Sequence, residues 1–196
     1  MPPTSPLLLI ISGPAGSGKT TLCDRLLETF PDRIQRVITT TSRPPRPGEI
    51  NGIHYHFLSP DDFRDKLAAG AFIEHASVHG RFYGTQRQDI LDGLGGHKDL
   101  LLNIDVQGAQ AFKADLTLQA LLPRLHSVFI KPQSLDQIKQ RLRHRATDDT
   151  REIERRLQSA TAEIACAESF DHCIVSHSKD EDFASLRRLY LHLSQP

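Results

Sequence analysis

The sequence predicts an α/β fold whose core is a parallel β-sheet. Residues 7–11 form a continuous apolar run, which is typical of a strand buried on both faces. A glycine-rich loop follows, and apolar residues then recur at helical spacing until Pro31. Two further apolar runs, 100–104 and 128–130, alternate with helical patterns. This alternation indicates helices packed against a parallel sheet.

The remaining helices are predicted from capping residues and apolar spacing. Ser59 and Pro60 begin a helix that Gly70 ends, and Ser134 with Gln137 forms a capping box. Each predicted helix has an apolar face that can pack on the sheet. The predicted helices cover residues 22–30, 59–69, 134–144, 149–167 and 180–193, and a weaker strand covers residues 173–175.

Residues 36–92 interrupt the alternation of strand and helix. Here the runs 36–41, 53–58 and 72–78 are rich in β-branched and aromatic residues, and proline and glycine turns separate them. Half-exposed strands of this kind predict a small mixed insertion on the parallel core.

Composition and charge exclude several functional classes. The chain has 196 residues, of which 24 are basic and 24 acidic, so no bulk charge favours nucleic acid or a membrane surface as partner. No apolar run approaches the roughly 20 residues that span a bilayer. Cys23, Cys166 and Cys173 lack the spacing of a disulfide framework or a zinc site. The first residues lack a signal-peptide pattern, so we expect a cytoplasmic protein.

The segment from Gly13 to Thr20 matches the phosphate-binding pattern G-x-x-x-x-G-K-[ST]. Its glycines allow successive backbone N–H groups to face one concavity, and the N-terminus of the following helix adds partial positive charge. Lys19 is expected to reach the β- and γ-phosphates, and the Thr20 hydroxyl to coordinate Mg²⁺. A polyphosphate fits this loop.

A phosphate loop alone is compatible with GTPases, ATPases and kinases of small molecules. Asp105 follows the apolar run 100–104 and is placed to face the nucleotide or its metal at the carboxyl edge of the sheet. Its Asp-x-x-Gly spelling, completed by Gly108, also resembles a GTPase switch, but the chain has no Asn-Lys-x-Asp sequence for a guanine base beside that loop. The alternative is an acid that only caps a turn.

A proline-rich segment carries two arginines, Arg43 and Arg46, held by three prolines. Fixing them costs little entropy, and planar guanidinium groups suit a second phosphate group. The hydroxyls of Tyr55 and Tyr83 can add hydrogen bonds to that phosphate. The lone carboxylate of Glu74 suits a base with two adjacent N–H donors, and guanine offers such an edge at N1 and N2.

Five segments of the chain stand out together: GPAGSGKT, TTTSRPPRPGEINGIHYHF, FIEHASVHGRFYGT, IDVQGAQ and RLRHRATDDTREIERRL. In this order and spacing they resemble the guanylate kinase family, over about residues 7–193. The resemblance implies a P-loop nucleoside monophosphate kinase core with a parallel sheet, a small mixed α/β GMP-binding insertion and a helical lid. It implies transfer of the γ-phosphoryl group of ATP to GMP, and also to dGMP, in purine nucleotide metabolism, with Mg²⁺ accompanying ATP.

Carried over by position, the resemblance implies roles for individual residues. ATP would be bound by Gly13, Pro14, Ala15, Gly16, Ser17, Gly18, Lys19, Thr20 and Thr21, with Thr20 on the metal. The GMP phosphate would be bound by Arg43, Arg46, Tyr55 and Tyr83, and the guanine would lie at or near Thr39, Glu74, Thr85 and Asp105. The catalytic cations would be Lys19, Arg43, Arg141, Arg145 and Arg156. The P-loop core would comprise residues 1–37, 93–133 and 162–196, the GMP-binding insertion residues 38–92, and the lid residues 134–161.

Four positions depart from the family's pattern. Thr39, Asn103, Ala146 and Ser176 stand where serine, an acid, glycine and asparagine are usual. Asn103 puts a metal role at that position in doubt, and Ser176 prevents carry-over of the adenine contacts. The charge pattern alone favours a solvated helix face for the lid arginines, and the resemblance reverses that preference.

Two alternatives to the kinase activity are compatible with parts of the sequence. One is a guanylate-kinase-like module that has lost turnover and binds a protein, but the retention of Lys19, Thr20 and Arg43 argues against it. The other is a P-loop kinase for another small phosphate acceptor. The expected partners are ATP and GMP, with no nucleic acid and no membrane, and both a monomer and a homo-oligomer are compatible with the sequence.

Overall fold

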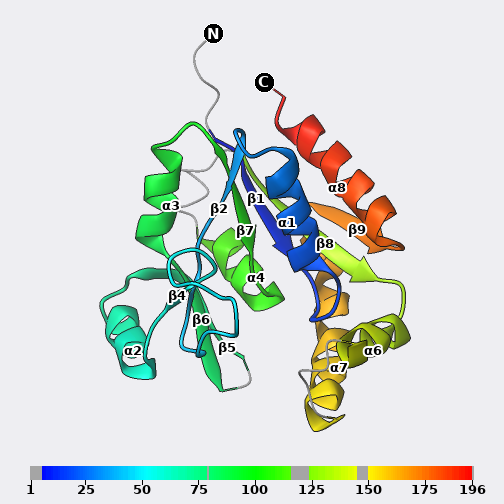
Figure 1. Ribbon diagram of the computed structural model, residues 1–196, viewed down its shortest axis with the longest axis horizontal. Helices are drawn as coiled ribbons and strands as arrows, with labels where there is room; N and C mark the ends of the chain where they lie inside the picture. The colour runs from blue at the N-terminus through cyan, green and yellow to red at the C-terminus, as the bar shows by residue number, and fades with distance from the viewer. Residues whose placement is uncertain (1–5, 79, 116–123, 145–149, 196) are drawn as a thin grey trace.

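A five-stranded parallel sheet forms the centre of the fold, in the order β2-β7-β1-β8-β9 (Figure 1). The computed structural model describes residues 6–78, 80–115, 124–144 and 150–195, with their side chains except those of residues 143, 144 and 150–153. All four pairings within this sheet are parallel, which confirms the predicted fold class. Its strands are β1 (Leu8–Ser12), β2 (Ile34–Arg36), β7 (Asp99–Asn103), β8 (Leu125–Pro132) and β9 (His172–Ser176).

Helices cover both faces of this sheet. On one face α1 (Lys19–Thr29) and α8 (Lys179–Leu193) pack against β1, and on the other α3 (Arg87–Leu94) and α4 (Val106–Ala114) contribute to a second apolar cluster (Figure 1). Alternate residues of 7–11 enter the two clusters, and all five are 0% exposed. This confirms a strand buried on both faces. In the described part of the chain, every helix is too short or too polar to cross a membrane.

The insertion forms a separate four-stranded sheet in the order β4-β3-β6-β5. Its elements are β3 (Thr40–Thr41), β4 (His56–Phe57), α2 (Pro60–Ala68), β5 (Phe72–Val78) and β6 (Arg81–Gln86). The pairing is mixed, with β3 parallel to β4 and antiparallel to β6. Phe63 of α2 is fully buried and stacks on Phe72 at a ring distance of 4.4 Å, which holds the helix on this sheet.

Two predicted strands of the insertion differ from the structure. The predicted strand 36–41 is divided between the two sheets, because its first residue ends β2 and residues 40–41 form β3. The predicted strand 53–58 is reduced to residues 56–57, because the chain around Gly52 turns back with a φ of 76°. The prediction for residues 72–78 is confirmed by β5.

A helix pair, α6 (Leu135–His144) and α7 (Thr150–Ala165), lies beside the phosphate loop. A 3₁₀ turn (Cys166–Ser169) continues α7 two residues beyond the predicted helix end at residue 167. Ile138, Leu142 and Ala160 form a buried apolar cluster between the two helices, and Ala15 of the loop packs against it. Asp149, where the predicted helix 149–167 begins, lies outside the described residues.

Asp99 ties the C-terminal helix to the start of β1. Its Oδ2 atom accepts a hydrogen bond from the hydroxyl of Tyr190, and its Oδ1 atom accepts one from the backbone N–H of Leu7, each at 2.9 Å. Tyr190 is 0% exposed, so its hydroxyl is removed from bulk water. One carboxylate therefore joins α8, β7 and the chain that enters β1.

We expect Tyr190→Phe to lower the free energy of unfolding by about 1–2 kcal/mol, because the substitution leaves one oxygen of Asp99 without its donor. Urea denaturation measures this difference. An unfolding free energy equal to that of the wild type would show that the tie contributes nothing to stability.

Candidate active site

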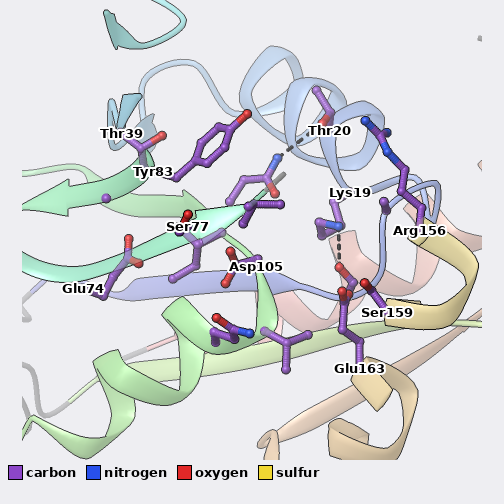
Figure 2. Close-up of a pocket in the computed structure, with 18 of the residues that line it drawn as sticks. Lys19, Thr20, Thr39, Glu74, Ser77, Tyr83, Asp105, Arg156, Ser159 and Glu163 are labelled. Atoms are coloured by element: carbon purple, nitrogen blue, oxygen red, sulfur yellow. Dashed lines mark hydrogen bonds between the residues drawn. The ribbon is translucent and has the colours of Figure 1, made fainter. Parts of the chain in front are cut away.

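A cavity of about 560 Å³ opens at the carboxyl ends of β1 and β7 (Figure 2). Four parts of the chain that are distant in sequence line it: the phosphate loop, the insertion, residues 103–107 at the end of β7 and the start of α4, and α7. Figure 2 shows Thr39, Glu74 and Tyr83 on one side and Lys19, Arg156 and Glu163 on the other. Of the predicted site residues, the cavity is lined by Gly13, Ala15, Lys19, Thr20, Thr39, Tyr55, Glu74, Tyr83, Asp105 and Arg156.

The loop between β1 and α1 has the backbone of a phosphate cradle. Gly13, Gly16 and Gly18 have φ angles of 138°, 83° and 98°, which L side chains rarely adopt. A Cβ on Gly13 would lie 2.6 Å from the carbonyl oxygen of Ile130, so β8 packs directly against the loop. Gly18 precedes α1 without a side-chain capping bond. The first amides of α1 are therefore available to an anion.

Lys19 folds its ammonium group back over this loop. Its Nζ atom donates to the carbonyl oxygens of Gly13 at 2.5 Å and Pro14 at 2.9 Å. The Oγ1 atom of the next residue, Thr20, accepts a hydrogen bond from Asn103 Nδ2 at 3.4 Å. The Thr20 hydroxyl and the Asn103 amide oxygen are hard oxygen donors of the kind that suits Mg²⁺. The residues present therefore fit a magnesium ion carried in with a nucleotide.

The acid that follows β7 both caps a helix and lines the cavity. Asp105 is the N-cap of α4, where its Oδ1 atom accepts a hydrogen bond from Gly108 N at 2.7 Å. The same side chain is part of the cavity wall (Figure 2). Asp105 therefore both caps α4 and lies at the carboxyl edge of the sheet, two roles that the sequence presented as alternatives.

Glu74 places a buried carboxyl group in the wall formed by the insertion. It is 4% exposed, and its Oε1 atom accepts a hydrogen bond from Thr85 Oγ1 at 2.6 Å. Burial raises the pKa of Glu74 to about 7, the Thr85 hydroxyl opposes the shift, and the negative charge of Asp105 adds to it. A carboxyl group in this state becomes a strong acceptor when N–H donors reach it, because they favour its ionised form.

The proline-rich loop is organised around Glu49. Its carboxylate accepts one hydrogen bond from each terminal nitrogen of Arg43, both at 2.9 Å, and a third from the backbone N–H of Arg46 at 2.6 Å. The hydrogen bonds with Arg43 lower the pKa of Glu49, and those with Glu49 raise the pKa of Arg43. The Arg43 guanidinium lies 5.5 Å from the ring centre of Tyr55, which lines the cavity.

The structure places two of the three predicted lid arginines, Arg141 and Arg156, in different surroundings. Arg156 lines the cavity. Arg141 instead donates to the carbonyl oxygen of Ser17 and to the hydroxyl of Ser176, each at 3.1 Å, so it binds the outside of the phosphate loop. Arg145 lies outside the described residues.

Several residues in and around the cavity were not predicted from the sequence. Ser159 and Glu163 line it one and two turns beyond Arg156, and this helical spacing is a signal that could have indicated them. Asp182 is 4% exposed and accepts a hydrogen bond from Ser176 at 2.5 Å. No local pattern indicates that contact, because a loop and a helix start separate the two residues.

Comparison with known proteins agrees with this geometry. The family model for guanylate kinase matches residues 5–192. The chain belongs to the guanylate kinase family. Guanylate kinases from Idiomarina loihiensis and Thiobacillus denitrificans are 40% and 43% identical to it, over 94% of this chain and 85% and 86% of their own lengths. The crystal structure of guanylate kinase from Anaplasma phagocytophilum is similar with a TM-score of 0.73 and 30% identity, over 97% of this chain and 88% of that chain.

Membership of the guanylate kinase family makes the chain a nucleoside monophosphate kinase, an ATP:GMP phosphotransferase. These comparisons do not favour the alternatives that the sequence left open, which were a GTPase, an inactive protein-binding module and a kinase for another phosphate acceptor. The family's reaction generally uses Mg²⁺, in agreement with the oxygen donors at Thr20 and Asn103.

We expect Glu74→Gln to stabilise the fold at pH 8. The folded-state pKa of about 7 exceeds the ordinary value of 4.5, so the protonated group contributes stability below pH 4.5 and this contribution is lost as pH rises through 7. At pH 8 the ionised, buried carboxylate therefore costs about 3 kcal/mol, which a neutral glutamine avoids.

Urea denaturation at pH 8 and at pH 4 measures this effect, with the exposed Glu28→Gln as the matched control. The gain should be present at pH 8 for Glu74→Gln alone and absent at pH 4. An equal gain at both pH values would contradict the assignment of a raised pKa to Glu74.

Proposed function

We propose that the γ-phosphoryl group of ATP is transferred to GMP in this cavity. The ATP phosphates would bind to the phosphate loop, and the guanine base would bind at Glu74. One observation carries the proposal. A lysine-bearing phosphate loop and a buried carboxyl group face the same cavity from opposite sides (Figure 2). The loop suits a polyphosphate, and the carboxyl group suits a base with adjacent N–H donors.

The proposed ATP site runs from Gly13 to Thr21. Backbone amides of the loop surround the phosphates, and the Lys19 ammonium exchanges its two carbonyl acceptors for β- and γ-phosphate oxygens. The Thr20 hydroxyl would hold Mg²⁺, with the Asn103 amide beside it. Bound magnesium would neutralise charge between the β- and γ-phosphates.

The proposed guanine site is the wall that contains Glu74. Thr85 holds one oxygen of the carboxylate, so the group has a defined direction from which to accept the guanine N1–H and N2–H bonds. Thr39 and Asp105 line the same cavity and supply further polar contacts to the base. Because a protonated Glu74 cannot accept both bonds, GMP binding requires its ionised form.

The proposed site for the GMP phosphate uses the loop that Glu49 organises. Arg43 and Arg46 provide the charge, and the hydroxyls of Tyr55 and Tyr83 at the cavity wall provide additional donors. The hydrogen bonds between Arg43 and Glu49 already restrain the guanidinium. Arg43 therefore loses less conformational entropy when a phosphate binds.

Catalysis in this proposal consists of positioning and charge neutralisation, with no covalent protein intermediate. Lys19 and Arg156 reach the cavity and stabilise the charge that spreads over the phosphoryl group in transfer. Arg141 supports the loop from outside through the Ser17 carbonyl oxygen. The role of Arg145 stays a prediction.

The division into core, insertion and lid is part of the same proposal. The boundary after residue 37 falls between β2 and β3, whereas the boundary between residues 92 and 93 falls inside α3. Use of dGMP and a cytoplasmic location also stay predictions. Coupled turnover with GMP, dGMP, AMP, UMP and a sugar phosphate tests the acceptor, and preference for any acceptor other than the guanine nucleotides would contradict the proposal.

We expect Lys19→Ala to reduce the turnover number by about 10²- to 10³-fold while the protein stays folded, because the lysine stabilises phosphate charge in the transition state. Lys98→Ala is the matched control, since Lys98 also donates to a backbone carbonyl, that of Pro31, but lies outside the cavity lining. Near-normal turnover by folded Lys19→Ala would remove this loop from the mechanism.

We expect Glu74→Gln to lower kcat/KM for GMP by at least about 10²-fold and to leave the KM for ATP unchanged, because only the acceptor base contacts this wall. For the wild type, kcat/KM for AMP should be lower than for GMP by about 10⁴-fold, since adenine offers a lone pair where guanine has N1–H. Steady-state assays with both nucleotides measure these ratios, and equal use of AMP and GMP would overturn the base assignment.

A further inference from the structure

The glycine of the Asp105–Gly108 motif has no role in the proposals above. Gly108 lies in the first turn of α4 and is buried, and it is not among the glycines with positive φ. A Cβ placed on it would lie 2.5 Å from Glu74 Oε2 and 3.0 Å from Glu74 Cδ. A Cβ atom essentially never approaches an oxygen as closely as 2.5 Å, so any larger residue at position 108 must move the Glu74 carboxylate.

The backbone at this position does not itself require glycine. A helical residue with ordinary φ accepts alanine, and alanine is the better helix former. The atoms that a Cβ would displace are the far end of a flexible side chain, which can rotate away at little cost to the fold. The absence of a side chain at Gly108 therefore affects the direction of the Glu74 carboxylate rather than the stability of the helix.

The Glu74 carboxyl group is confined from its other side as well. Thr85 on β6 donates to Oε1 at 2.6 Å. Strand β6 and the first turn of α4 therefore hold Glu74 between them. The direction of the carboxylate depends on close approach to both elements.

We propose that Gly108 is a positioning residue for base recognition, because its missing side chain lets the Glu74 carboxylate lie against α4 with both oxygens directed at the guanine N1–H and N2 amine. The inference rests on the proposed function of this cavity. A side chain at position 108 turns the carboxylate away from one donor, so discrimination between guanine and a base that lacks the 2-amino group is lost while the fold is retained.

Gly108→Ala tests this inference, with Gly93→Ala as the matched control. Gly93 is also a buried helical glycine, but its Cβ would press on Leu100, at 2.7 Å, and on no cavity residue. We measure kcat and KM for GMP and for IMP, which keeps N1–H and lacks the 2-amino group, together with the KM for ATP and the thermal midpoint.

We expect Gly108→Ala to lower kcat/KM for GMP about 100-fold and the GMP-to-IMP preference by at least about 10-fold. The KM for ATP and the thermal midpoint should stay at wild-type values. Gly93→Ala should leave the GMP-to-IMP preference unchanged. An unchanged preference in folded Gly108→Ala would overturn the inference, as would an equal change in the Gly93→Ala control.

The same substitution in the Glu74→Asp background supplies a second, independent test. The shorter aspartate withdraws the carboxylate from position 108, so Gly108→Ala should cost less than about 3-fold in kcat/KM there, against about 100-fold beside glutamate. An equal loss in both backgrounds, or failure of the double variant to fold where Glu74→Asp folds, would overturn the inference. Failure of the proposed function is distinguishable, because the wild type itself would then not phosphorylate GMP.

Discussion

Burial of β1 on both faces is the constraint on which the site depends. A strand with apolar side chains on both faces has to lie in the middle of a sheet, between β7 and β8, with helices on either side. Because β1 lies beside β8, the chain that leaves the carboxyl end of β1 passes close to the end of β8. The approach of Gly13 to the Ile130 carbonyl oxygen is the result. The phosphate loop is therefore positioned by the core.

The parts of the fold that were predicted from the sequence are those in which a local pattern carries the information. The apolar run of 7–11 and the loop ending in Lys19 and Thr20 are of this kind. The split of residues 36–41 between two sheets is not, because β-branched residues favour a strand without specifying its partner. In the site, Asp105 was located by its place after a strand. The contact of Arg141 with Ser176 joins α6 to the end of β9, so only the tertiary fold reveals it.

The cavity wall that contains Glu74, where the guanine base is proposed to bind, illustrates a conflict between recognition of the base and stability of the fold. A base with two N–H donors is read best by a carboxylate in a dry, narrow position, and that position raises the pKa of Glu74 to about 7. The Thr85 hydroxyl offsets part of the burial, while the charge of Asp105 opposes ionisation. In the proposed site, the free protein keeps a buried acceptor whose missing hydrogen-bond partners would be supplied by the bound base.

The contact between the α6–α7 pair and the phosphate loop combines an apolar cluster with a directed hydrogen bond, and this affects how the two parts can move. Ala15 packs against the cluster of Ile138, Leu142 and Ala160, and a Cβ on Gly16 would lie 3.4 Å from Leu142. Apolar contacts have no preferred direction, whereas the hydrogen bonds from Arg141 to the Ser17 carbonyl oxygen and the Ser176 hydroxyl fix the position of α6 against the loop and β9. The loop and the helix pair therefore meet as one packed unit, and any change in the position of α6 requires the Arg141 hydrogen bonds to break.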